Sequence, residues 1–193
     1  MGQIYLCRHG ETEWSLSGQH TSATDLPLTK RGEEQALLLR KRLEDVRFEK
    51  VFTSPLKRAM ETCKGLGGVA DEDLVEWKYG DYEGLTTKEI CGKEPEWDLF
   101  AEGAPNGESP KEVAKRADRF LKKVSGCKGN VAVFSHGHFL RVLATRFLSW
   151  DVDKARSFLV STASVSILGY ERRQPVVILW NSRGGDDQMH EKG

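Results

Sequence analysis

The chain alternates short apolar runs, partly β-branched, with longer stretches of helical periodicity. The short runs lie at Ile4 to Cys7, Val51 to Thr53 and Val131 to Phe134, and a helical pattern follows each of them. Runs of this length and composition are typical of buried strands. Because strands that alternate with helices form a parallel sheet with helices packed on it, the pattern predicts an α/β fold of three layers, α/β/α, with a mostly parallel central sheet.

The clearest helical pattern covers Pro110 to Val124. Ser109 can cap this helix, Pro110 suits its first position, and Glu112 completes a capping box. Its apolar residues recur at a spacing that places them on one face. Two further helices are predicted at Lys30 to Leu43 and at Phe139 to Leu148.

The last third of the chain predicts two more strands, Ser164 to Tyr170 and Val176 to Trp180, whose spacing allows a hairpin. The stretch Ala101 to Ser109 has the composition of a loop. At 193 residues the chain is long enough for one well-packed core. We therefore predict a single domain over residues 1–182, followed by a disordered tail over residues 183–193.

The overall composition argues against polyanionic partners. The formal net charge is zero, with 29 basic and 29 acidic residues, so neither nucleic acid nor an anionic membrane surface is an expected partner. No apolar run approaches the roughly 20 residues of a membrane span, and the start lacks the pattern of a secretory signal, so we expect a cytoplasmic protein. The four cysteines form no Cys-x-x-Cys pair, so neither a zinc site nor a disulfide framework is expected. The sequence gives no indication of oligomeric state.

Two histidines follow predicted strands. His9 lies in CRHGETEW, directly after the first strand, and His136 lies in FSHGHFLR, after the strand Val131 to Phe134. In open α/β sheets the ligand crevice lies outside the carboxyl ends of the strands, so the two imidazoles could face each other across it. Arg58, in FTSPLKRAMET, is expected in the first turn of a helix, where anions are favoured.

This set of side chains suits a phosphate dianion. Arg8 and Arg58 would supply guanidinium groups that match phosphoryl oxygens, and His9 and His136 would supply imidazoles. A histidine is also a nitrogen nucleophile when its second nitrogen is fixed. For the acid that a leaving oxygen needs, the segment LVEWKYGDYEG offers three carboxyl groups, those of Glu76, Asp81 and Glu83.

Each of these features also has a structural interpretation. A lone histidine after a strand is more often structural than catalytic, and Cys7 fits the inward face of a core strand. The aromatic residues of EWKYGDYEG are expected to pack in the core. A metallohydrolase built on His136 and His138 would need further clustered ligands, which the sequence does not offer. The combination of Arg-His-Gly, His-Gly-His and a helix-start arginine favours the functional interpretation.

The order of motifs resembles a known family. The strings CRHGETEW, DLPLTKRGEEQA, FTSPLKRAMET, EWKYGDYEG, PNGES and FSHGHFLR are similar to those of the histidine phosphatase superfamily, which has the phosphoglycerate-mutase-like fold. The resemblance covers about residues 3–180. WSLSGQHT, EWKYGDYEG and TASVSILGYE resemble the branch that holds fungal sedoheptulose-bisphosphatase and mycobacterial acid phosphatases.

The resemblance implies a role for each member of the set. It implies that His9 accepts the phosphoryl group, that Arg8, Arg58 and His136 hold this group, and that Glu76 donates the proton. It also implies that the reaction needs no metal and no organic cofactor.

Further residues are candidates for substrate binding. Ser15 stands where many members carry Asn, and it can still donate a hydrogen bond to phosphate. His138 stands where mutases have Asn, and its backbone N–H is available to the phosphate. His20 and Ser22 occupy positions of substrate contacts in the family, and Glu83 is expected to hold its loop or contact substrate.

We therefore expect a phosphomonoesterase that acts on a small phosphorylated metabolite through a phosphohistidine. Only thirty positions separate Glu76 from Asn106, whereas mutases of the family tend to carry longer closing segments. Water can reach a phosphohistidine more easily in an open pocket, and this favours hydrolysis. The alternatives are a phosphoglycerate mutase and, from another class, an inactive domain that binds a phosphorylated ligand. Sugar bisphosphates, phosphoglycerates and nonspecific monoesters are all candidate substrates.

Overall fold

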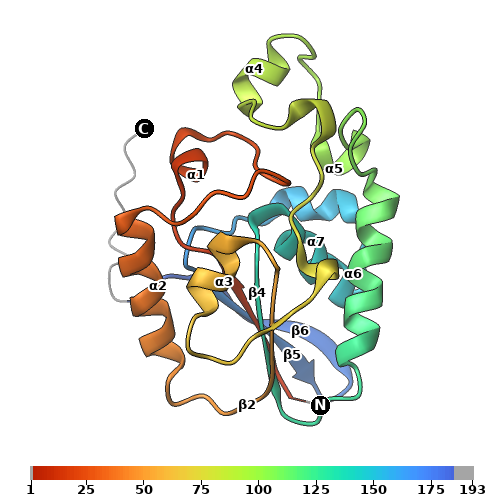
Figure 1. Cartoon of the computed structure of the whole chain (residues 1–193). Coiled ribbons are helices and arrows are strands. Elements are labelled where there is room, and N and C mark those ends of the chain that lie inside the picture. The colour runs from red at the N-terminus through yellow and green to blue at the C-terminus, as the bar shows by residue number, and fades with distance from the viewer. Residues whose placement is uncertain (1, 185–193) are drawn as a thin grey trace.

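The computed structural model describes residues 2–184, so residues 185–193 of the predicted tail lie outside the described residues. One six-stranded sheet forms the centre, in the order β3-β2-β4-β1-β5-β6 (Figure 1). Its strands are β1 (Ile4–Arg8), β2 (Phe48–Thr53), β3 (Val69–Ala70), β4 (Asn130–Ser135), β5 (Val165–Glu171) and β6 (Gln174–Ser182). Each of the five predicted strands is found, with longer bounds for most of them.

The sheet is mostly parallel, as predicted. β1 pairs with β4, β4 with β2, and β2 with β3, all in parallel. β5 runs antiparallel to β1, and β6 forms an antiparallel hairpin with β5. In the central pair, Ile4 lies opposite Val131 and Arg8 lies opposite Ser135. This register brings the ends of β1 and β4 level with each other.

Helices cover both faces of the sheet. α2 and α3 pack on one face and α6 and α7 on the other, while α1, α4 and α5 lie beyond one end of the strands (Figure 1). The helices are α1 (Glu13–Ser17), α2 (Lys30–Leu43), α3 (Lys57–Cys63), α4 (Thr87–Cys91), α5 (Leu99–Glu102), α6 (Pro110–Val124) and α7 (Gly137–Phe147). Three 3-10 turns are η1 (Glu72–Leu74), η2 (Gly80–Tyr82) and η3 (Val152–Ser157). Within residues 2–184, no helix is long and apolar enough to cross a bilayer.

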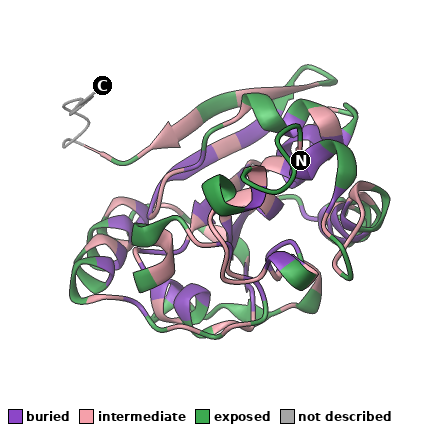
Figure 2. Ribbon diagram, turned by 90° about the horizontal axis from the view of Figure 1, so that it is seen from above, coloured by how far each residue is buried: buried purple, intermediate pink, exposed green. Residues whose placement is uncertain are grey.

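The period of two along the strands divides the core into two clusters. Leu6 packs with Phe120 of α6 in one cluster, whereas its neighbour Cys7 packs with Leu39 of α2 in the other. Successive strand side chains point to opposite faces, so both faces of the inner strands are buried. Figure 2 shows this burial along the inner strands, while β6 at the sheet edge is intermediate to exposed.

Local sequence signals predicted the bounds of the long helices accurately. α6 has the predicted bounds and capping box, and α2 has the predicted bounds with Thr29 as its cap. α7 begins two residues earlier than predicted, at Gly137. The predicted loop Ala101 to Ser109 is wrong at its start, because Ala101 and Glu102 complete the short helix α5, which the side chain of Asp98 caps.

Two glycines let α2 pack directly on the loop that follows β1. A Cβ atom added to Gly10 would lie 2.4 Å from the carbonyl oxygen of Gly32, and one added to Gly32 would lie 2.1 Å from the carbonyl oxygen of Glu11. The backbone N–H of Thr29 also donates to Glu11 O at 3.0 Å. The loop that carries His9 is therefore fixed by backbone contact with the start of α2.

Gly32→Ala is expected to destabilise the protein. The substitution would favour the helix by about 1 kcal/mol, but its methyl group would overlap a backbone oxygen, and overpacking of this kind costs about 1–3 kcal/mol or more. We expect a net loss in the free energy of unfolding, measured by urea denaturation. Gly126→Ala is the control, since a Cβ there meets nothing within 4 Å, and it should stay within about 0.5 kcal/mol of the parent. Equal stability of the two variants would contradict the close approach.

Candidate active site

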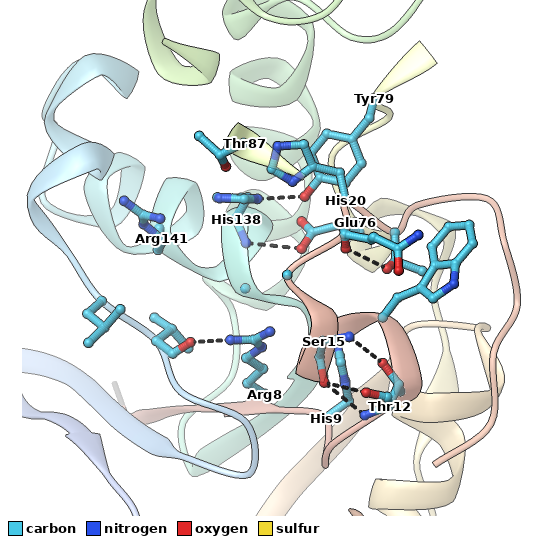
Figure 3. Close-up of a pocket in the computed structure, with 17 residues that line it drawn as sticks. Arg8, His9, Thr12, Ser15, His20, Glu76, Tyr79, Thr87, His138 and Arg141 are labelled. Carbon is cyan, nitrogen blue, oxygen red and sulfur yellow. Dashed lines mark hydrogen bonds between the residues drawn. The ribbon is translucent and has the colours of Figure 1, made fainter. Parts of the chain in front are cut away.

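A cavity of about 280 Å³ opens at the carboxyl ends of β1 and β4 (Figure 3). Six of the ten predicted site residues line it, namely Arg8, His9, Ser15, His20, Glu76 and His138. Ser22 and Glu83 line a second cavity of about 630 Å³, and Glu76 belongs to the walls of both cavities. Arg58 and His136 are fully buried, and the His136 ring lies 5.2 Å from the His9 ring between centroids.

Main-chain contacts fix His9 just beyond β1. Its N–H donates to Ser135 O and its carbonyl accepts from Ala163 N, each at 3.0 Å. The ring atom Nδ1 lies 2.7 Å from Gly10 O. A carbonyl oxygen can only accept, so Nδ1 carries the hydrogen and the lone pair of the neutral ring is on Nε2. Burial, with the charges of Arg8 and Arg58, holds the pKa of His9 well below its ordinary value, so the ring is neutral near pH 7.

His136 is also held in one tautomer. Arg58 Nε donates to His136 Nδ1 at 3.1 Å, which requires a lone pair on Nδ1. Burial and the charge of Arg58 keep the pKa of His136 well below its ordinary value, so the proton of the neutral ring is on Nε2. That N–H donates to Ser54 Oγ at 2.8 Å.

The guanidinium of Arg58 also holds the loop of residues 21–24. Its terminal nitrogens donate to the carbonyl oxygens of Thr24 (3.0 Å), Thr21 (3.1 Å) and Ser22 (3.3 Å). Glu83 binds the same loop through its carboxylate, which accepts from Ser22 N, Ser22 Oγ and Thr24 N. The structure thus places Ser22 and Glu83 in the support of this loop, beside the second cavity.

Arg8 contributes positive charge to the wall of the cavity. Its Nη1 donates to Val160 O at 2.6 Å, and its buried Nε has no hydrogen-bond partner among the described residues. A Cβ added to Gly137, the first residue of α7, would lie 3.3 Å from Arg8 Cζ. The start of α7 and the guanidinium therefore adjoin, and both favour an anion.

Backbone donors fix the carboxyl group of Glu76. Oε1 accepts from Trp77 N and from Phe139 N, each at 2.8 Å, and Oε2 accepts from His138 N at 3.1 Å. The amides of His138 and Phe139 belong to the first turn of α7, so Glu76 takes the place of a capping side chain there. Because Oε2 accepts one such bond and Oε1 accepts two, Oε2 keeps more capacity to bind a ligand.

Three rings form another wall of the cavity. The hydroxyl of Tyr79 lies 2.5 Å from His138 Nδ1, and the ring of His20 stacks on the Tyr79 ring at 4.7 Å between centroids. Burial lowers the pKa of both histidines and raises the pKa of Tyr79. Sequence reasoning treated Tyr79 as a packing residue, whereas its hydroxyl is part of the polar wall.

Ser15 belongs to a capping box at the start of α1. Its Oγ donates to Thr12 O at 3.0 Å and accepts from Thr12 N at 2.8 Å. The side chain lines the cavity, but its hydroxyl proton is used inside the cap. The phosphate contact that the resemblance implies for Ser15 stays a prediction.

Arg141 is a cavity residue that sequence reasoning missed. Its guanidinium donates to the carbonyls of Ala155 and Arg156, and it lies 4.4 Å above the centroid of the Phe100 ring. Burial lowers the pKa of Arg141 to about 10. The available signal was its spacing of three residues from His138, which places both side chains on one face once the helix predicted from Phe139 is extended back to His138.

Among residues 2–184, no three side chains of His, Cys, Asp or Glu lie together as a potential metal site.

The four histidines of the site are expected to make the protein less stable in acid. The pKa values of His9, His20, His136 and His138 all lie below the ordinary value in the folded protein. Between pH 6.5 and pH 5 the unfolded chain therefore binds protons that the folded protein does not. The free energy of unfolding should be highest above pH 6.5 and should fall below it, by up to about 1.4 kcal/mol per pH unit for each histidine.

Urea titrations at intervals from pH 7.5 to pH 5 measure this dependence. His138→Asn should give a shallower slope, because one of the four groups is removed. A slope equal to that of the parent would mean that His138 titrates alike in the folded and unfolded chain.

Comparison with known proteins agrees with this geometry. Residues 4–183 match the model of the histidine phosphatase superfamily, branch 1. An acid phosphatase of Mycobacterium tuberculosis is 39% identical over 88% of this chain and 87% of that protein. The sedoheptulose 1,7-bisphosphatase of Saccharomyces cerevisiae is 36% identical over 77% of this chain and 68% of that protein.

A solved structure gives the same relationship in three dimensions. The product of an open reading frame of Mycobacterium tuberculosis superposes with a TM-score of 0.88 at 35% identity, covering 93% of this chain and 97% of that one. The family match, the sheet order and the cavity at the strand ends together show that this chain belongs to the histidine phosphatase superfamily.

Proposed function

We propose that this phosphatase hydrolyses a small phosphorylated metabolite, a sugar phosphate or a similar monoester, through a phosphohistidine on His9. The observation that carries the proposal is the hydrogen bond from His9 Nδ1 to Gly10 O. It leaves the lone pair on Nε2, in a ring that lines a cavity with the cationic Arg8. A neutral imidazole with a fixed tautomer is the form that can attack phosphorus.

In the first step, the lone pair of His9 Nε2 forms a bond to phosphorus, and the bond between phosphorus and the ester oxygen breaks. The leaving oxygen takes the electron pair of that bond together with a proton from Glu76. The products are an alcohol, a phosphohistidine and the Glu76 carboxylate. Oε2 is the oxygen that we assign to this proton transfer, because it accepts one backbone bond where Oε1 accepts two.

In the second step, water attacks phosphorus and gives a proton to the Glu76 carboxylate. The P–N bond breaks, its electron pair returns to Nε2, and inorganic phosphate leaves. Glu76 then holds the proton needed for the next cycle, so one carboxyl group serves as acid and then as base.

Positive charge around His9 supports both steps. Arg8 is on the cavity wall, and the charge of Arg58, which binds the neutral ring of His136, acts on His9 from outside the cavity. Charge that spreads over the equatorial oxygens during transfer is stabilised by such groups. Direct contact of Arg58 and His136 with the phosphoryl group, which the family resemblance implies, is part of the proposal. The backbone N–H of His138, which the resemblance also offers to the phosphate, donates to Glu76 Oε2 in the described structure.

The size and polarity of the cavity favour a small polar substrate. A volume of about 280 Å³ is near the lower end for ligand pockets. His20 and His138 are the candidates for contact with the alcohol portion, and Ser15 remains a candidate for contact with the phosphate. Ser22 and Glu83 act by holding the 21–24 loop. The relatives named acid phosphatase and sedoheptulose 1,7-bisphosphatase support a monoester substrate and, for the second, a sugar phosphate.

Release of phosphate to water is the expected outcome of the second step. The segment between Glu76 and Asn106 folds into the short elements η2, α4 and α5, and the cavity remains open to solvent in the described structure. An inactive binding domain would need the arginines and not the acid. The presence of Glu76 on the cavity wall therefore supports an active enzyme.

The first test is detection of the phosphoenzyme. Enzyme mixed with a ³²P-labelled monoester and quenched in base should retain label, and the same sample quenched in acid should lose it, because a phosphoramidate is labile in acid. His9→Ala should retain none in either quench.

His138→Asn serves as the control, since it changes a neighbouring imidazole and leaves the nucleophile intact. Label that persists in His9→Ala, or that survives acid in the parent, would exclude His9 as the acceptor.

The second test separates the two carboxyl groups by leaving-group basicity. An alkoxide needs a proton as it leaves, and a positioned acid contributes roughly 100- to 10,000-fold to that step. A nitrophenolate leaves without this help. Glu76→Gln should therefore slow phosphorylation of His9 by an alkyl phosphate and spare phosphorylation by p-nitrophenyl phosphate. Because the base for water is also lost, the nitrophenyl ester should give a burst followed by slow turnover.

Glu83→Gln is the matched comparison in the same segment. It weakens the support of the 21–24 loop, so it should slow both esters to a similar extent and give no burst. A burst in Glu83→Gln, together with none in Glu76→Gln, would reverse the assignment of the two groups.

A further inference from the structure

Arg116, on α6, is a buried arginine that lies outside the catalytic cavity. It is 5% exposed, and five hydrogen bonds use its five N–H donors. Nε and Nη2 bind the two carboxylate oxygens of Glu108 at 2.9 and 2.7 Å. The other three bonds go to main-chain carbonyl oxygens, those of Asp73 (2.8 Å), Val75 (2.7 Å) and Glu76 (3.2 Å).

These three carbonyls belong to the segment that brings Glu76 to the cavity. The segment leaves the 3-10 turn η1 and runs extended past Val75, outside the six strands of the sheet. Buried carbonyl groups need donors, which a neighbouring strand would normally supply. Here the guanidinium of Arg116 supplies them, so the path of the main chain into Glu76 follows this one side chain.

Arg116 also contacts the residue that holds the Glu76 carboxylate. Its guanidinium lies 4.4 Å from the centroid of the Phe139 ring, and the backbone N–H of Phe139 donates to Glu76 Oε1 at 2.8 Å. A single planar group therefore sets both the backbone of Glu76 and the turn of α7 that binds its carboxylate.

Glu108 fixes the chain on the other side of Glu76. Its carboxylate accepts from Lys78 N at 3.0 Å, its carbonyl accepts from Trp77 Nε1 at 2.8 Å, and its N–H donates to Lys78 O at 2.8 Å. The ion pair of Arg116 and Glu108 thus holds residues both before and after Glu76.

We propose that the Arg116–Glu108 ion pair is a positioning device for the acid and base Glu76, acting through the main chain without touching the substrate. The inference rests on the proposed role of Glu76. A buried ion pair adds little net stability compared with apolar residues of the same size. Proton transfer, in contrast, needs donor and acceptor within hydrogen-bond reach, and a displacement of about 1 Å can cost about 100-fold in rate.

The test is Arg116→Lys, which keeps the charge but cannot bind three carbonyls and a carboxylate at once. Single-turnover phosphorylation of His9 should be about 10- to 100-fold slower with an alkyl phosphate and within about twofold of the parent with p-nitrophenyl phosphate, which needs no acid. Retained reaction with the nitrophenyl ester also shows that the variant is folded.

Arg119→Lys is the matched control. Arg119 lies one turn further along α6, and its guanidinium binds the side chain of Asp73 at the surface. Arg119→Lys should change the rate of phosphorylation by no more than about twofold with either ester, as expected for an exposed ion pair. If Arg116→Lys does not fold, Glu108→Gln replaces it with the same expectations.

A double variant distinguishes a positioning role of Arg116 from a general disturbance of the active-site structure. With the alkyl ester, Glu76→Gln with Arg116→Lys should be no slower than Glu76→Gln alone, because a positioning residue has no effect once the acid is gone. Three outcomes would overturn the inference. They are rate losses of the two substitutions that add in the double variant, a rate loss in Arg116→Lys that is equal for both esters, and no rate loss in Arg116→Lys. If Glu76→Gln slows the alkyl and nitrophenyl esters equally, the proposed role of Glu76 is wrong. This result does not depend on Arg116, so failure of the proposed function can be distinguished from failure of the positioning role.

Discussion

The parallel pairing of β1 with β4 is the constraint on which the site depends. Arg8 lies opposite Ser135 in this register, and the N–H of His9 extends the ladder by one bond to Ser135 O. His9 and His136 are therefore the first residues beyond two adjacent strands that end level with each other. A change of register by one residue would turn every side chain of β1 to the opposite face, so the core alternation of Leu6 and Cys7 also fixes the direction of Arg8.

Two buried guanidinium groups near this point are stabilised in the same way. Arg58 and Arg116 direct their donors to main-chain carbonyls of loops that approach the site. Removing a charge from water is expensive, and hydrogen bonds to carbonyl dipoles offset part of the cost. These hydrogen bonds also fix the positions of the loops, because the guanidinium groups supply donors to carbonyl groups that have no partner in a neighbouring strand. Arg8 differs, since its Nε has no partner among the described residues, and it faces the cavity where an anion would bind.

The sequence predicted the parts of the fold that local patterns determine. Ser109 and Glu112 fixed the start of α6, and β-branched runs placed the strands, because these signals lie within a few residues. The loop of residues 21–24 was not predicted, since it depends on partners far along the chain, such as Glu83 for Ser22 and Arg58 for Thr24. The short helices α4 and α5 were missed although each has a local cap, Thr86 with Glu89 for α4 and Asp98 for α5. The motif arginines and histidines could be assigned to one site from their places at strand ends. The hydroxyl of Tyr79 could not, because only tertiary packing brings it to the cavity wall, and the side chain of Arg141 had only its spacing of three residues from His138 as a signal.

Glu76 occupies the place of a cap on α7, and this joins two equilibria that are usually separate. Two amides in the first turn of the helix, those of His138 and Phe139, donate to its carboxylate. A proton on that carboxyl group would compete with them for the same oxygen lone pairs. Opening of the first turn of α7 and protonation of the Glu76 carboxyl group are therefore linked. The free energy by which protonation favours opening equals the free energy by which opening favours protonation. Amide hydrogen exchange at these two positions would report, from within a helix, the ionisation of a group in the cavity.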